Sequence, residues 1–413
     1  MRRAPFFVFI LIFYLLLDYY VFQAVKVVVE SSIPSYKRLA YTVYWTLTAF
    51  TFIAVVAFLK LDSVKYHYLR TIMMSAVVIN FVSKFVAVLF IFMGDIVRLG
   101  QWAYNGIVHN GITKPSSGKG IPRSEFLSKT ALIAGAVPSA IFSFGIISGA
   151  YDYRIRKKTI TMPNLPKAFD GVRLAQLSDI HSGSFYNKTA VKGGIDMLLG
   201  EKPDVIFFTG DLVNNESREV KNYIDIFSKV KAPLGVYSTL GNHDYGDYAK
   251  WSSEHEKRKN LQDLIQTHKN MGWDILLDES RYLETGGEKL GIIGVQNWGA
   301  KFAKYGNLEK AAHNVEAPVK ILLSHDPSHW DAQVRLGHKD IDLTLSGHTH
   351  GFQFGVEIGN FKWSPAQYMY KQWADLYQEE NQYLYVNRGY GFLGYPGRVG
   401  ILPEITIIEL KSA

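Results

Sequence analysis

The chain has 413 residues, no cysteine and a formal net charge of +8. The absence of cysteine excludes disulfide-stapled folds, thiol catalysis, thiolate zinc sites and iron–sulfur clusters. Residues 1–158 hold 18 Lys and Arg against 6 Asp and Glu, whereas the remainder holds 27 against 31. Because the basic excess lies in the N-terminal part, where it can meet anionic lipid headgroups, we expect no nucleic-acid partner.

Four N-terminal stretches are long and apolar enough to cross a bilayer, which takes about 20 residues. They are residues 5–25, 39–59, 71–93 and 130–151. Only Asp18 and Lys84 place a charge within them. A large soluble core is the alternative, but globular helices of this length normally carry a polar stripe. The pattern predicts a multi-pass membrane protein whose first stretch is an anchor, since it lacks a small-residue cleavage site.

Lys84 lies near the middle of the third stretch. Charges inside a membrane are costly and commonly functional. We favour the simpler alternative, in which Lys84 forms a structural pair with Asp18 or lies between helices.

The orientation in the membrane is weakly encoded. With the N-terminus inside, nine Lys and Arg would lie inside and eight outside, which is nearly balanced under the positive-inside rule. The basic cluster at 154–158 favours a cytoplasmic catalytic domain. Residues 123–129 resemble an export signal of the twin-arginine type, but the second arginine is missing. We therefore expect the catalytic domain on the cytoplasmic face.

The same patterns divide the chain into three parts. Residues 1–153 form the transmembrane region, with a Gly-, Ser- and Lys-rich loop over 105–120. Residues 154–169 are expected to be a linker. Residues 170–413 form the catalytic domain, and we find no internal repeat.

Five apolar runs in this last part are each followed by polar residues. The runs are 172–178, 204–209, 234–240, 319–324 and 341–346. Their length and their β-branched and aromatic content predict buried strands. The motifs that follow them are Asp179-Ile-His181, Gly210-Asp211, Gly241-Asn242-His243-Asp244, Ser324-His325-Asp326 and Gly347-His348-Thr349-His350. Since ligands bind beyond strand ends, we expect the motifs to meet at one edge of a sheet.

These side chains are typical ligands of divalent metals. A mixture of carboxylate, imidazole and amide suits Mn, Zn, Fe or Mg. Taken singly, each motif could be a loop, a surface pair, a turn or a helix cap. Their ordered occurrence after five strands predicts a site for two ions, which together can stabilise the attacking and leaving oxygens of an in-line displacement. Gly210, Gly241 and Gly347 are expected to allow sharp backbone turns.

In this order the motifs resemble those of the calcineurin-like metallophosphoesterase superfamily. Within it, the chain resembles the membrane-anchored YkuE-like branch, and the resemblance covers roughly residues 170–411. The resemblance implies an α/β fold, a two-sheet β-sandwich flanked by helices. It also implies roles for the motif residues. By this resemblance, Asp179, His181 and His350 bind the first metal, and Asn242, His325 and His348 bind the second. Asp211 bridges the two metals. His243 acts as the general acid or stabilises the phosphate, and Asp244 orients it.

Two further features lie beyond the last motif. Residues 352–377 contain eight aromatic side chains together with Lys362 and Lys371. The segment either covers the sheet or forms an aromatic, basic lip that reaches the lipid headgroups. Arg388 is a candidate phosphate ligand, because guanidinium matches phosphate bidentately, or else a simple turn residue.

These observations predict a membrane-anchored, metal-dependent phosphohydrolase that cleaves a phosphoester or diphosphate bond, with a lipid-linked substrate favoured. An anchored phosphodiesterase for soluble substrates is one alternative. A catalytically idle membrane scaffold is another, which the complete ligand set argues against. The oligomeric state stays open.

Overall fold

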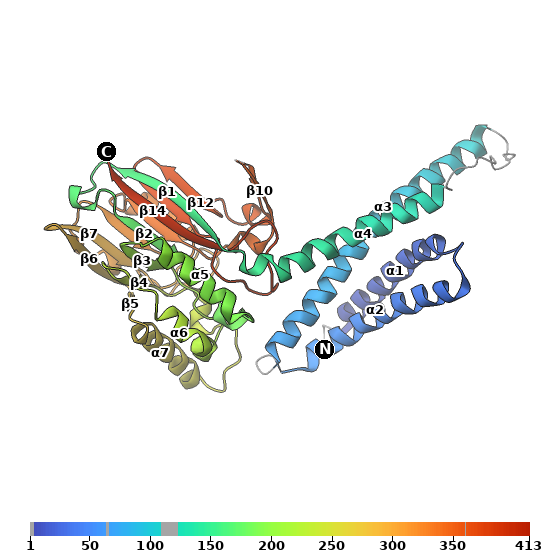
Figure 1. The fold of residues 1–413 in the computed structure, drawn as a ribbon, viewed down its shortest axis with the longest axis horizontal. Helices are drawn as coiled ribbons and strands as arrows, with labels where there is room; N and C mark the ends of the chain where they lie inside the picture. Colours follow the sequence, from blue (N-terminus) through green and yellow to red (C-terminus); the bar gives the residue numbers. More distant parts are fainter. Residues whose placement is uncertain (1–3, 63–65, 109–122, 360) are drawn as a thin grey trace. The chain divides into compact units, whose positions relative to one another are not determined.

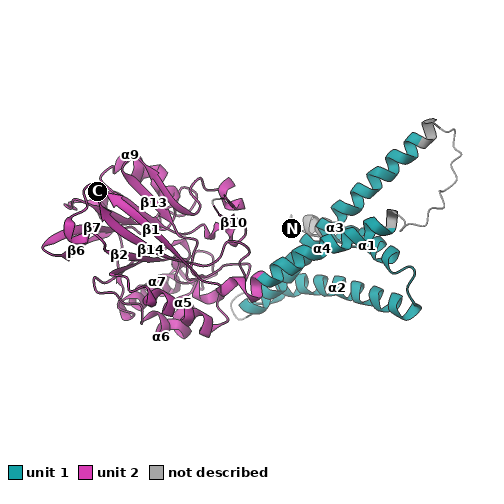
Figure 2. Cartoon of the chain, turned by 45° about the horizontal axis from the view of Figure 1, so that its top comes forward, with its two compact units in different colours: residues 1–144 teal, residues 145–413 magenta. Residues whose placement is uncertain are grey.

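The structure, a computed structural model, describes residues 4–62, 66–108, 123–359 and 361–413. It divides into two compact units, Met1–Phe144 and Gly145–Ala413 (Figure 2). The first unit contains the long helices α1 (Ala4–Val28), α2 (Pro34–Lys60), α3 (His67–Val108) and most of α4 (Arg123–Ile147). All four are long and apolar enough to cross a membrane, so the chain is a membrane protein. Of the loop expected over 105–120, residues 105–108 instead belong to α3, and residues 109–122 lie outside the described part.

The two charges predicted inside the membrane region meet in the first unit. Lys84 on α3 forms an ion pair with Asp18 on α1, and both side chains are buried. The Tyr44 hydroxyl of α2 donates to the Asp18 carbonyl at 2.7 Å, which brings the third helix to the pair. The structural pairing of Lys84 with Asp18 is therefore confirmed.

We expect Lys84→Leu to lower the free energy of unfolding by about 3–5 kcal/mol, because it leaves a buried carboxylate without its counter-charge. Thermal unfolding of the full chain in detergent measures this effect. The double variant Asp18→Leu/Lys84→Leu removes both charges and should recover most of the loss. Equal stability of the single variant and the wild type would contradict a structural role for the pair.

The second unit is a sandwich of two six-stranded sheets (Figure 1). In spatial order, the first sheet consists of β1 (Arg154–Met162), β14 (Glu404–Ser412), β2 (Arg173–Leu177), β3 (Val205–Phe208), β4 (Val236–Ser238) and β5 (Asp274–Ile275). The second consists of β12 (Asp375–Glu379), β13 (Gln382–Val386), β9 (Leu343–Ser346), β8 (Lys320–Leu323), β7 (Glu288–Gly294) and β6 (Glu279–Thr285). The predicted two-sheet sandwich is confirmed, and each of the five apolar runs contains a strand.

The strands that lead to the motifs are buried on both faces. On β3, Val205 and Phe207 pack in the core between the two sheets, whereas Ile206 and Phe208 pack on the outer side. Because both faces of the strand are buried, its sequence is a continuous apolar run. The helices α5 (Lys188–Gly200), α6 (Ile224–Phe227) and α7 (Glu254–Asn270) cover the outer side of the first sheet (Figure 1). On the second sheet this side is covered by α8 (Leu308–Ala312) and by the helical turn Trp330–Val334, which leads into α9 (Arg335–Gly337).

Residues 154–162 are not a linker. They form β1, which pairs in parallel with β14 from Arg154↔Glu404 to Met162↔Ser412. The basic residues of this run are tolerated because β1 is an edge strand, and charged side chains are common on edges. Its inward residues Ile160 and Met162 belong to the core between the sheets.

Candidate metal centre

The motifs converge from both sheets rather than from one. Parallel strands β2, β3 and β4 of the first sheet lead to Asp179, Asp211 and Asn242. Parallel strands β8 and β9 of the second sheet lead to His325 and His348. The expectation of a single sheet edge is thus wrong. The carboxyl ends of the two parallel sets open onto one site between the layers.

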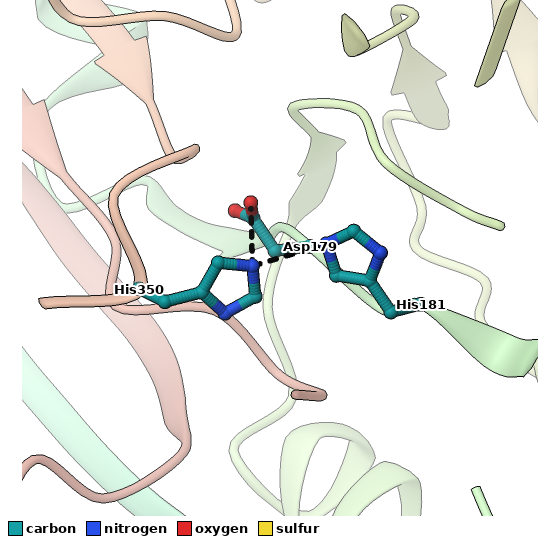
Figure 3. A group of neighbouring side chains, drawn as sticks. All are labelled: Asp179, His181 and His350. Carbon is teal, nitrogen blue, oxygen red and sulfur yellow. Dashed lines mark hydrogen bonds and ion pairs between the residues drawn. The ribbon is translucent and has the colours of Figure 1, made fainter. Parts of the chain in front are cut away.

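Asp179, His181 and His350 form the first group of possible metal ligands (Figure 3). The Nε2 atoms of His181 and His350 lie 3.0 Å apart, and Nε2 of His350 lies 3.3 Å from Oδ1 of Asp179. All three residues are buried.

Asp211, His325 and His348 form the second group. Nδ1 of His348 lies 3.2 Å from Nε2 of His325 and 2.9 Å from Oδ1 of Asn242, which brings the seventh expected ligand into place. Asp211 lies between the groups, because its Oδ2 is 3.2 Å from Nε2 of His325 and 3.5 Å from Nε2 of His181. The structure therefore gathers all seven residues at one place.

Three imidazoles are oriented by partners on the side away from the site. Nδ1 of His325 lies 2.8 Å from the Thr209 carbonyl, and Nδ1 of His181 lies 3.1 Å from Oδ1 of Asn214. Nε2 of His348 lies 2.7 Å from the Tyr370 hydroxyl. Partners of this kind fix the tautomer and leave the inner nitrogen lone pair available to a metal. Sequence reasoning missed Asn214 and Tyr370 in this role, although Asn214 follows Asp211 by only three residues.

His350 is held differently. Its Nδ1 lies 3.1 Å from Nη2 of Arg398, which can only donate. In this arrangement the ring proton therefore sits on Nε2. For Nε2 to bind an ion, the ring or Arg398 must move.

The metal-ligand residues themselves make the tight backbone turns. Five of them have left-handed φ values between 48° and 70°: Asp179, His181, Asp211, His348 and His350. Residues other than glycine rarely adopt this region, and such strain gathers at functional sites. Of the three glycines expected to turn, only Gly210 has a positive φ, of 95°. The others provide space, since a Cβ at Gly241 would lie 2.2 Å from Oδ1 of Asp211, and one at Gly347 would lie 2.0 Å from Oγ of Ser178.

His243 and Asp244 have separate tasks. Nδ1 of His243 lies 2.8 Å from the Asn214 carbonyl, and its ring centroid lies 5.0 Å from that of His181. Among the described residues, no hydrogen bond joins the Asp244 carboxylate to the His243 ring. The carboxylate accepts backbone N–H bonds from Gly241, Asp211, Leu212 and Val213. These bonds tie together the turns that follow β3 and β4, and they do not support the expectation that Asp244 orients His243.

Arg388 is a structural residue in this arrangement. Its side chain is fully buried, and its guanidinium donates to Glu404 at 2.6 Å and to Glu357 at 2.6 Å. A guanidinium occupied by two carboxylates is not available to bind phosphate. The expected phosphate-binding role is thus not supported.

Comparison with known proteins finds two families that match different parts of the chain. Residues 172–352 match the calcineurin-like phosphoesterases, and residues 1–150 match a family described as the transmembrane domain of probable calcineurin-like phosphoesterases. Residues 172–352 are a calcineurin-like phosphoesterase domain. They lie within the second unit, and the first unit lies within the match to the transmembrane domain.

Three curated relatives illustrate the range of this phosphoesterase family. The "Transmembrane protein with metallophosphoesterase domain" of Danio rerio is 28% identical over 69% of this chain and 63% of that protein, so the match spans less than two thirds of the relative. The "Uncharacterized metallophosphoesterase YkuE" of Bacillus subtilis is 29% identical over 71% of this chain and 99% of that protein. The "UDP-2,3-diacylglucosamine pyrophosphatase LpxG" of Chlamydia trachomatis is 27% identical over 55% and 81%.

Burial sets the charge state of the phosphoesterase site. It lowers the pKa of His181 to about 3 and that of His348 to about 4, and it holds the pKa of His350 well below its usual range. Burial acts in the same direction on His325, but the charges of Asp211 and Asp179 outweigh it and raise its pKa to about 10. At neutral pH three rings are thus uncharged, as metal ligands must be, and an ion that binds His325 must displace a proton.

Proposed function

We propose that the protein is a membrane-anchored phosphohydrolase that holds two divalent ions and cleaves a phosphoester or diphosphate bond of a lipid-linked substrate. The observation that carries the proposal is the position of Asp211 Oδ2, within 3.5 Å of an imidazole nitrogen from each group. One carboxylate oxygen between two ligand groups suits a bridged pair of Mn, Zn, Fe or Mg ions. When bound, such ions supply Lewis-acid polarisation and an activated water.

The chain's own residues divide the remaining work. Asp179, His181 and His350 would hold one ion, Asn242, His325 and His348 the other. His243 is the general acid, because its Nδ1–H donates to the Asn214 carbonyl and leaves Nε2 to carry a second proton. That proton passes to the oxygen of the leaving group as the bond to phosphorus breaks.

Three features favour a lipid-linked substrate over a soluble one. The domain is carried on a membrane region, and a relative's name specifies a diacylated diphosphate substrate. A cavity of ≈ 290 Å³ adjoins Tyr370, the hydrogen-bond partner of His348, and gives room for the part of the substrate beyond the phosphate. Asp326 lines this cavity, and its buried Oδ2 is without a hydrogen-bond partner among the described residues, so it could accept from a substrate hydroxyl.

The catalytic domain is assigned to the cytoplasmic face. The assignment is supported by the basic residues 154–158, which follow the fourth membrane helix directly. Labelling of Leu336→Cys in intact cells by a membrane-impermeant maleimide would contradict it.

We expect cells that overproduce the wild-type protein to lose a phosphorylated lipid that cells overproducing Asp211→Asn retain. The reason is that both proteins occupy the membrane equally, while only the wild type has a complete bridge. Mass spectrometry of total lipid extracts measures the difference. An unchanged lipid profile, together with ready cleavage of soluble nucleotide diesters, would favour the soluble-substrate phosphodiesterase instead.

A further inference from the structure

A two-stranded hairpin beside the metal centre exposes its apolar side. Strand β10 (Val356–Ile358) pairs with β11 (Phe361–Trp363), with Val356 opposite Trp363 and Ile358 opposite Phe361. Directly paired residues, and residues two apart, share one face of a ribbon, so these four side chains form one apolar face. Ile358 is 73% exposed and Phe361 is 62% exposed. Tyr368 and Met369, which follow in the chain, are also exposed, at 76% and 50%.

The polar side of this hairpin is turned inward and fixed there. Glu357 accepts from the buried Arg388 at 2.6 Å and also pairs with Arg156. Lys362 donates to the Ala374 carbonyl at 2.8 Å. The usual arrangement of a water-exposed ribbon, polar side out and apolar side in, is therefore reversed. The burial of Arg388, unexplained by phosphate binding, fits this task of holding the hairpin.

The base of the hairpin is hydrogen-bonded to the loop at Arg398 and Val399, and this loop also contacts the end of α4. Within the second unit, the Gly355 amide donates to the Val399 carbonyl at 2.9 Å, and the Val399 amide donates to the Gln353 carbonyl at 2.8 Å. The neighbouring Arg398 amide donates to the carbonyl of Gly145, in the final turn of α4, at 3.1 Å. The candidate membrane span that includes α4 runs on to Tyr151. Within the second unit, the hairpin is therefore bonded to the loop that contacts the C-terminal end of the last candidate membrane span.

The same segment borders the metal centre on both sides. His350 precedes the hairpin by six residues and contacts Arg398, while Tyr370, which orients His348, comes directly after Met369. Trp373 of the same segment is buried in a cluster with Ala374, whereas Phe352 is exposed. Part of the segment therefore packs against the domain, and part of it faces outward.

We propose that Val356, Ile358, Phe361, Tyr368 and Met369, which we call the apolar lip, insert into the interfacial layer of the bilayer that holds the four helices. Apolar and aromatic side chains are stabilised at that depth, and the inward salt bridges of Glu357 keep them turned toward it. The lip holds the metal centre at headgroup level. The inference rests on the membrane region and on the hairpin's contacts, and not on the proposed hydrolase activity.

The absence of cysteine allows a direct test with single labels. The full chain bearing Ile358→Cys and a bimane label is reconstituted into vesicles of phosphatidylcholine and phosphatidylglycerol, with and without brominated acyl chains. The control is Leu336→Cys on α9, which is 66% exposed and precedes β9, whereas the metal motif follows β9. Figure 2 shows α9 well away from β10. We expect brominated lipid to quench the label at position 358 several-fold more than the label at 336.

Equally weak quenching at both positions would overturn the proposal. A label at 358 that iodide cannot reach, that brominated lipid does not quench, and whose shielding grows with protein density would overturn it as well, since a second copy would then cover the lip. Thermal unfolding of both labelled proteins checks that the fold is kept. Because no substrate or metal is added, failure of the proposed hydrolase activity would leave this result unaffected.

Discussion

Replacing Asp211 by asparagine should remove both metal binding and hydrolysis. The wild-type chain should bind two ions, and Asp211→Asn should bind markedly fewer, because the substitution removes a negative charge that lies against both ligand groups. Loss of an outer partner of a metal ligand already costs about 10–100-fold in affinity or activity, and loss of a shared ligand should cost more. Metal analysis after equilibration with Mn or Zn, with turnover of an aryl phosphodiester, measures both effects on the full chain.

An exposed carboxylate provides the matched control. Asp340 pairs with Lys320 at the surface, so Asp340→Asn makes the same chemical change away from the site. It should keep both ions and full turnover. If the wild type itself binds no more than one ion under saturating Mn or Zn, the two-ion assignment is wrong, whatever the variants do.

Replacing His243 by alanine should leave the metal content intact and lower turnover by about 10²–10⁴-fold, the usual contribution of a general acid. The His243 ring is bonded to the Asn214 carbonyl through Nδ1, and it is the backbone N–H of His243, kept in the variant, that donates to Asp211 at 2.9 Å. Metal analysis and the turnover number, measured on the same preparation, provide the test. His313→Ala, at an exposed histidine, should change neither quantity.

The two variants are informative together. If His243→Ala proves as poor in metal as Asp211→Asn, His243 is a ligand or supports one, and its assignment as an acid fails. If turnover is unchanged, the leaving group is protonated by water or by another residue.

The convergence of the metal-ligand residues could be predicted because it depends on local patterns. Each apolar run ends where its polar motif begins, and strands buried on both faces leave an unmistakable apolar run, as β3 does between Val205 and Phe208. The division of these strands between two sheets could not be predicted, because strand order depends on long-range pairing. Nothing near β8 indicates that its neighbours are β7 and β9.

The sequence predicts a residue's role poorly where the same side chain can bond to several kinds of partner. Arg388 and Asp244 carry the right chemistry for phosphate binding and for orienting a histidine, but their partners come from distant turns and strands. The basic run 154–158 fits equally well a membrane flank or an exposed edge strand. It forms an edge strand because it pairs with Glu404–Ser412, about 250 residues away in sequence.

The pairing of β1 with β14 also constrains the order in which the protein can form during synthesis. β1 emerges directly after the membrane helices, yet among the described strands its partner is β14, close to the last residue. Contacts between segments so far apart in sequence form slowly and late. While the ribosome still holds the C-terminal segment, β1 has an open edge next to the bilayer, and such edges invite pairing with other chains. During this time the basic residues of β1 repel another copy of the same strand, and so disfavour its pairing with a second chain.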